Sequence, residues 1–339
     1  MTKYLNILLL LNLFFFNGCK TPINRKITHY IKNDGDTLIL FGSVKSVQSV
    51  VYEAFDNFGK IKKGKISSAP FDPQESLTFD IDGTILTILT THSNGLSFES
   101  SFKNGDLIEQ RGYKNGNLIE LTLFKRFNKV EVERKLYLDS TLFEFEKSTL
   151  DENGKVIKIE YFDKKGNTTG IQRCKYYYNH SFLVKEEWFN DKNELVSERQ
   201  YDKSGNKIKS IEILTEFQSK KKDTTYTSFE YSNKKVTNEV SYNSRFSKAP
   251  QSTKRIYNSF GKLIKLVTFD KNAQPIENYI SDYDNFGNLI SFKFFGDPFH
   301  DEFEHTISYE FDKNNNWIKS IEMKGIIPLQ ITERQIAYN

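Results

Sequence analysis

The stretch Tyr201-Asp-Lys-Ser-Gly205-Asn-Lys-Ile-Lys-Ser-Ile-Glu-Ile213 decides the fold class, because it joins a turn signal to a strand signal. An Asp side chain caps a type I turn, and the Gly three residues later takes a positive φ freely. The segment after the turn is rich in β-branched residues, as strands are. We therefore interpret this stretch as a hairpin turn followed by a strand.

The same unit recurs along the chain. Its pattern is an aromatic residue, Asp or Asn, two variable residues, Gly or Asn, one polar residue and an apolar residue. Only Ala273 breaks the rule at the position expected to have positive φ, which is otherwise filled by Gly59, Gly154, Gly166, Asn193, Gly205, Gly261, Gly287 and Asn315. Copies that start at Leu150 and Phe162 are 12 residues apart, which is one strand plus one turn. The repeat predicts a series of antiparallel hairpins.

No internal segment has a sustained helical period, so no significant helix is expected after the signal peptide. We predict an all-β fold, an antiparallel meander of about 16 to 20 strands. Because strands twist, so many of them do not form a flat open sheet. The expected architecture is a long, curled sheet or an open barrel.

The N-terminus has the features of a secretion signal. Lys3 is followed by an apolar run from Tyr4 to Phe16 and then by Asn17-Gly18-Cys19. A run of about 13 residues is shorter than the roughly 20 that a helix needs to span a bilayer. Gly18-Cys19 resembles a bacterial lipobox, although Phe16 stands where that motif usually has Leu, and the resemblance implies a lipid on Cys19. The predicted domains are a signal peptide (1–18), a tether (19–36) and an antiparallel β-repeat domain (37–339).

The repeats also resemble a known family. Units such as Tyr201-Asp-Lys-Ser-Gly205 and Tyr283-Asp-Asn-Phe-Gly287 are similar to the YD repeats of RHS-type proteins. The segments that begin at Phe41 and Tyr309 resemble the two ends of uncharacterised RHS/YD-repeat-like bacterial lipoproteins. The resemblance implies a strip of hairpins on a lipid-anchored envelope protein and brings no catalytic residues.

Composition excludes several classes of protein. The formal net charge is +4 with both signs mixed along the chain, which disfavours a nucleic-acid partner. Two Cys cannot form a disulfide framework or a multi-Cys zinc site. A mean hydropathy of −0.57 excludes a multi-pass helical membrane protein, and 14% aromatic residues exclude a disordered chain.

Two motifs imitate reactive sites. Phe79-Asp-Ile-Asp-Gly83-Thr-Ile85 is similar to the opening motif of haloacid-dehalogenase-type phosphatases, but it also fits the repeated turn unit. His300 and His305 would face opposite sides of a strand, so we interpret their segment as a solvated acidic loop. Cys174 is interpreted as a buried structural thiol. We therefore predict no catalytic residue, no cofactor and no metal site.

Aromatic side chains are the remaining candidates for contact with a partner, because their faces can stack on sugar rings. The candidate glycan- or protein-contact residues are Tyr176, Tyr178, Trp188 and Trp317. The favoured function is a lipid-anchored, non-enzymatic binding protein of the Gram-negative cell envelope, facing the periplasm from the outer membrane or lying at the cell surface. The alternatives are an envelope hydrolase with carboxylates on the concave face of the sheet and a purely structural envelope component.

Overall fold

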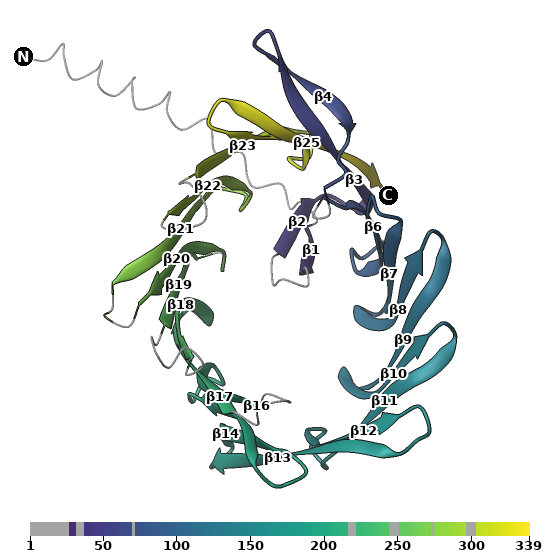
Figure 1. Cartoon of the computed structure of the whole chain (residues 1–339), viewed down its shortest axis with the longest axis vertical. Helices are drawn as coiled ribbons and strands as arrows, with labels where there is room; N and C mark the ends of the chain where they lie inside the picture. Colours follow the sequence, from purple (N-terminus) through teal and green to yellow (C-terminus); the bar gives the residue numbers. More distant parts are fainter. Residues whose placement is uncertain are drawn as a thin grey trace, which may run out of the picture.

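A computed structural model describes residues 27–31, 37–69, 72–215, 222–243, 251–259, 261–270, 272, 274–295 and 303–339 (Figure 1). The predicted signal peptide (1–18), Cys19 and Ala273 lie outside these residues. The regular structure of the described residues is β-strand, and none of them is helical. The all-β prediction is therefore confirmed for this part of the chain.

The first two strands, β1 (Ile27–Ile31) and β2 (Thr37–Phe41), form a separate antiparallel pair, and β1 falls within residues 19–36, the predicted tether. The other described strands form one wall in sequence order: β3 (Val44–Asn57), β4 (Lys60–Ile66), β5 (Gln74–Phe79), β6 (Ile85–Thr91), β7 (Leu96–Lys103), β8 (Asp106–Lys114), β9 (Asn117–Phe127), β10 (Val130–Leu138), β11 (Thr141–Leu150), β12 (Val156–Asp163), β13 (Thr168–Asn179), β14 (Phe182–Phe189), β15 (Leu195–Tyr201), β16 (Lys207–Thr215), β17 (Lys222–Ser232), β18 (Lys235–Asn243), β19 (Gln251–Tyr257), β20 (Leu263–Phe269), β21 (Pro275–Tyr283), β22 (Leu289–Phe295), β23 (Phe303–Phe311), β24 (Trp317–Lys324) and β25 (Ile327–Tyr338).

The wall closes on itself as a ring of 22 described strands, β3 and β5 to β25 (Figure 1). The last strand, β25, pairs with β3 from Gln330 opposite Glu53 to Tyr338 opposite Val44. On its other side, β3 pairs with β5 near its start and with β4 near its end, so β4 extends beyond the ring. The antiparallel meander is as predicted, but the described strands outnumber the roughly 16 to 20 expected and the barrel is closed rather than open. Closure pairs the two edges that an open sheet would leave exposed.

The inward face of the wall is identified by the β1–β2 pair, which lies inside the ring (Figure 1). Leu40 of β2 forms a buried cluster with Val47, Leu77 and Ile88 from three neighbouring wall strands. Directly paired residues point to the same side of a sheet, so the register carries this assignment from strand to strand. The largest buried apolar cluster of the described residues therefore lies where β2 meets the inner wall.

The outward face is charged in the middle of the strands. Lys319 pairs with Glu310 at 2.7 Å, and Lys293 pairs with Glu304 at 2.9 Å. Successive side chains of a strand point to opposite faces, so in β22 Phe292 points inward and Lys293 points outward. The residues of these strands therefore alternate between the inside and the outside of the ring.

Most of the predicted turns have the expected hydrogen bonds. At Asp202, the carboxylate oxygen accepts from the N–H of Ser204 at 2.8 Å and of Asn206 at 2.9 Å, and Gly205 has φ of 81°. Positive φ is shared by the predicted positions Gly154, Gly166, Asn193, Gly205, Gly261, Gly287 and Asn315. The capped turn is thus the repeated local structure that joins the strands.

Gly59 is an exception to the predicted shared turn. Phe58 and Gly59 both have positive φ, of 54° and 80°, and they form a two-residue connection between the paired residues Asn57 and Lys60. Two successive positive φ values define a type I′ hairpin, which matches the twist of the flanking strands. The assignment of Gly59 to the capped turn is therefore wrong.

Inward tyrosines join neighbouring strands at one end of the wall. The hydroxyl of each donates to the carbonyl of the first residue in the preceding strand. The pairs are Tyr176 with Val156 at 2.8 Å, Tyr231 with Lys207 at 2.8 Å, Tyr283 with Leu263 at 3.1 Å and Tyr309 with Leu289 at 2.7 Å. Phe could not replace Tyr in these contacts, since Phe has no donor.

Candidate binding pocket

The four predicted contact residues do not form one site. Trp188 lies on β14 and Trp317 lies on β24, so nine strands of the ring separate them. Tyr176 is occupied by its bond to the Val156 carbonyl, and burial raises the pKa of its hydroxyl. Tyr178 is about half exposed, and the Lys155 ammonium lies 4.7 Å from its ring centre.

Trp317 is covered by a cation. The guanidinium carbon of Arg334 lies 3.3 Å from the centre of the indole ring. Burial lowers the pKa of Arg334 to about 9, against the opposite effects of Glu75 and Tyr309. With this face already occupied, Trp317 is a packing residue rather than an open platform.

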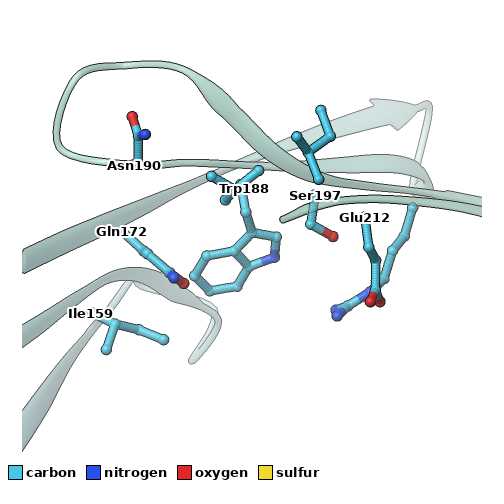
Figure 2. A pocket seen from close by; sticks show the side chains of 9 residues that line it. Ile159, Gln172, Trp188, Asn190, Ser197 and Glu212 are labelled. Carbon is cyan, nitrogen blue, oxygen red and sulfur yellow. The ribbon is translucent and has the colours of Figure 1, made fainter. Parts of the chain in front are cut away.

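Trp188, in contrast, lines a pocket of about 580 Å³ on the wall (Figure 2). The lining residues come from β12 to β16 and from the turn after β14: Ile159, Gln172, Trp188, Asn190, Val196, Ser197, Arg199, Glu212 and Ile213. The register makes Ser197 the direct partner of both Trp188 and Glu212 on the neighbouring strands. Trp188, Ser197 and Glu212 are therefore presented as one row across three strands.

Two buried polar atoms of this pocket have no hydrogen-bond partner, the indole nitrogen of Trp188 and the hydroxyl oxygen of Ser197. Figure 2 shows the indole between the side chain of Gln172 on one side and those of Ser197 and Glu212 on the other. Buried polar groups in folded proteins are almost always satisfied by protein, water or a ligand. The pocket therefore offers a donor and a hydroxyl beside an aromatic ring.

The charges beside the indole are unequal. Arg199 donates to the Glu186 carboxylate at 2.7 Å, and Glu212 adds a second negative charge near the guanidinium. Burial lowers the pKa of Arg199, but the hydrogen bond and charge of Glu186, with smaller effects of Tyr201 and Glu212, outweigh burial and hold the pKa above its usual value. Two carboxylates against one guanidinium make the site unfavourable for an anion.

Cys174 lies beside Trp188 on the same face of the wall. It is buried and pairs directly with Trp188 across β13 and β14. Burial raises the pKa of its thiol to about 11, although a hydrogen bond with Tyr176 acts in the opposite direction. The thiol is therefore protonated at neutral pH, which is typical of a structural Cys and not of a nucleophile.

Sequence reasoning found Trp188 but missed Gln172, Ser197, Arg199 and Glu212. Each is an ordinary polar residue in a strand, and only the register brings them beside the indole. Their alternate spacing, as in Ser197 and Arg199, is the only signal in the sequence that could have placed them on one face.

The two imitation motifs have structural roles in the described residues. The Asp80 carboxylate accepts from the N–H groups of Asp82 and Thr84 at 2.9 and 2.8 Å, as in the other capped turns. His305 contacts Glu322 at 2.5 Å between Nδ1 and Oε1, whereas His300 lies outside the described residues. In the part of the chain that the structure describes, no three His, Cys, Asp or Glu side chains gather as a metal site would require.

Within the described residues, no helix is long and apolar enough to cross a membrane.

Among known proteins, only solved structures show a similarity to this chain. No family model matches the chain, and no curated protein matches it. A solved porin-like protein from Bacteroides vulgatus ATCC 8482 is similar over 60% of this chain and 96% of its own, with 13% identity and a TM-score of 0.27. A porin-like protein from Bacteroides uniformis ATCC 8492 is similar over 87% of this chain and 98% of its own, with 9% identity and a TM-score of 0.25.

The neighbours found are thus porin-like proteins and not RHS or YD-repeat proteins, so the family resemblance drawn from the sequence is wrong. The repeated Asp-capped turn that suggested it is local, and it occurs here in a closed ring instead of a strip. Identities and TM-scores this low carry no argument about function.

Proposed function

We propose that this protein is a lipid-anchored, non-enzymatic barrel of the Gram-negative envelope that binds a carbohydrate in the Trp188 pocket. The observation that carries the proposal is the pair of unpartnered buried atoms, the Trp188 indole N–H and the Ser197 hydroxyl. A sugar presents hydroxyl groups that both donate and accept, together with an apolar ring face that packs on an indole. It would satisfy both orphaned groups and cover the ring at once.

The net charge of the pocket indicates which class of carbohydrate it would bind. Glu186 and Glu212 exceed Arg199 by one negative charge. An acidic sugar would add a further negative charge to this site. We therefore favour an uncharged carbohydrate.

The proposed address rests on residues 1–19, where a short apolar core is followed by Gly18-Cys19. A lipid on Cys19 would hold the barrel at the outer membrane, facing the periplasm or the cell surface. The outward ion pairs at Lys293 and Lys319 agree with a wall that contacts water, because lysine facing lipid at mid-bilayer costs about 2 to 4 kcal/mol. Retention of Cys19→Ala in the membrane fraction would contradict the anchor.

The pocket is tested by titrating the purified protein with neutral and acidic oligosaccharides and measuring heat and indole fluorescence. We expect a neutral glycan to bind, Trp188→Ala to abolish binding, and Ser197→Ala to weaken it. Tyr177→Ala is the matched control, because Tyr177 lies on the opposite face of the neighbouring strand and pairs with Lys185. Failure of every neutral glycan to bind, or unchanged binding by Trp188→Ala, would reject the site.

A hydrolase remains the second candidate, because Glu212 lines the pocket together with Arg199, and Arg199 also contacts the Glu186 carboxylate. Paired carboxylates are the groups that cleave glycosidic bonds. Chromatography of the bound glycan after long incubation separates the two functions. Intact glycan supports binding alone, whereas a product that disappears with Glu212→Gln would establish catalysis.

A further inference from the structure

One turn of the wall breaks the pattern that its equivalents follow. Six described turns join strands with two residues that both have positive φ. The first of these residues is Asn or Asp in five of them: Asn104, Asn115, Asn128, Asp139 and Asn233. In the β3–β4 turn it is Phe58, a bulky residue that enters this backbone region with strain.

The local sequence does not force Phe58 into this conformation. Asp56-Asn-Phe-Gly59 is identical to Asp284-Asn-Phe-Gly287, yet Phe286 is not among the residues with positive φ. The side chain of Phe58 is fully exposed, so it gains nothing from packing inside the protein. A strained and fully exposed aromatic residue indicates a contact that lies outside the chain.

A second apolar tip lies beside the first. Because β25 pairs with the outer part of β3, the β24–β25 turn and the β3–β4 turn lie at the same end of the wall. At that turn Ile326 is 92% exposed and Ile327 is 60% exposed. We call Phe58, Ile326 and Ile327, with Lys60 and Lys62, the twin-hairpin tip.

The surroundings of the tip are basic. Residues 53–66 contain four lysines and two acidic residues. Lys63 pairs with Glu333 at 2.7 Å and Lys65 with Glu53 at 3.2 Å. Within the described residues Lys60 and Lys62 make no ion pair, and both are exposed beside Phe58. Exposed apolar residues with free lysines next to them match the boundary of an anionic bilayer, where rings enter the interface and ammonium groups meet phosphates.

We propose that the twin-hairpin tip inserts into the headgroup region of an anionic lipid bilayer, as a membrane contact separate from the proposed lipid on Cys19. The tip projects at the side of the ring formed by β3 and β25 (Figure 1). The contact would therefore turn this side of the barrel toward the bilayer and fix its orientation.

The test uses the full chain, purified in detergent and reconstituted into vesicles of phosphatidylethanolamine and phosphatidylglycerol that contain brominated lipid. Bromine quenches indole fluorescence only at short range. The Phe58→Trp variant is expected to be quenched beyond the wild-type background of Trp188 and Trp317. Ile81→Trp is the matched control, because Ile81 is also an exposed apolar turn residue, 71% exposed, but lies at the opposite end of the wall. No added quenching in Phe58→Trp, or equal quenching in both variants, would overturn the proposal.

A second arm tests the role of charge and of Phe58 itself. In vesicles of phosphatidylcholine alone, or with Lys60→Glu and Lys62→Glu added, the quenching of Phe58→Trp should fall several-fold. Phe58→Asn should fold at least as stably as wild type, since Asn occupies this position in Asn104 and Asn115, and it should reduce the quenching of Ile326→Trp. Equal quenching in phosphatidylcholine vesicles and in vesicles that contain phosphatidylglycerol would overturn the assignment to anionic lipid. Membrane retention of Cys19→Ala measures the lipid anchor separately.

Discussion

At the scale of the residue, the glycine that ends each capped turn isolates the free-energy cost of a positive φ. A Cβ built on Gly205 or Gly287 meets no atom within 4 Å, so a substitution there would not clash with a neighbour. Gly205→Val and Gly287→Val should each lower the free energy of unfolding by about 1 to 2 kcal/mol, because only the backbone conformation is penalised. Thermal or denaturant midpoints measure the effect.

Asparagine provides the control for this prediction. Asn193 and Asn315 hold the equivalent position with φ of 60° and 66°. Gly205→Asn should therefore be nearly as stable as wild type, with Gly205→Ala between Asn and Val. If the Asn and Val variants have equal midpoints, the turns are not equivalent.

The candidate site could be predicted only in part at this scale. Trp188 was recognised because of its residue type, but Trp317 has the same type and is covered by Arg334. Ser197 and Glu212 gain their role from pairing with neighbouring strands, which no local pattern reports. The residue type identifies an aromatic side chain that could stack on a ligand. Only the pairing of the strands determines whether the face of that side chain is accessible.

At the scale of the element, the inward tyrosines connect the end of one strand to the start of the strand before it. Tyr309→Phe and Tyr231→Phe would each leave a carbonyl, of Leu289 or Lys207, without this donor. We expect each change to lower the free energy of unfolding by about 1 kcal/mol, since the rings remain in place and one hydrogen bond is lost. Chemical denaturation of the purified variants measures this difference.

Tyr177→Phe is the matched control for the tyrosine prediction. Its hydroxyl bonds to the Glu187 side chain at the surface, where water replaces a lost partner. Its effect should stay within about 0.5 kcal/mol. A loss in the control as large as in Tyr309→Phe would show that the carbonyl contacts have no special role.

The strands and capped turns were predictable because their signals are local. An Asp or Asn that accepts from the amides two and four residues later needs only a short segment. The limit appears at Asp56-Asn-Phe-Gly59 and Asp284-Asn-Phe-Gly287, where identical residues form different turns. The pairing of Asn57 with Lys60 decides the first case, and this pairing depends on how β3 continues past the ring.

At the scale of the whole molecule, closure was beyond prediction because its contacts join the two ends of the chain. The Asn316 side chain bonds the backbone N–H and carbonyl of Phe41, each at 2.7 Å and 275 residues away. Local turn signals fix the order of neighbouring strands but say nothing about whether the last strand meets the first. The closed ring follows from the pairing of β25 with β3, which leaves neither strand as an edge.

Closure can be tested with two prolines in β25. Successive residues of an antiparallel strand direct their amides to opposite neighbours. Of Thr332 and Glu333, one therefore donates toward β24 and the other toward β3, and both residues are paired on both sides. In a closed ring, Thr332→Pro and Glu333→Pro should each lower the free energy of unfolding by about 3 kcal/mol, because each removes a ladder hydrogen bond. In an open sheet β25 would be an edge, and one of the two prolines would be tolerated. Denaturant unfolding measures the free energy of unfolding of each variant. If the two values differ by most of about 3 kcal/mol, because one proline is tolerated, the barrel is not closed.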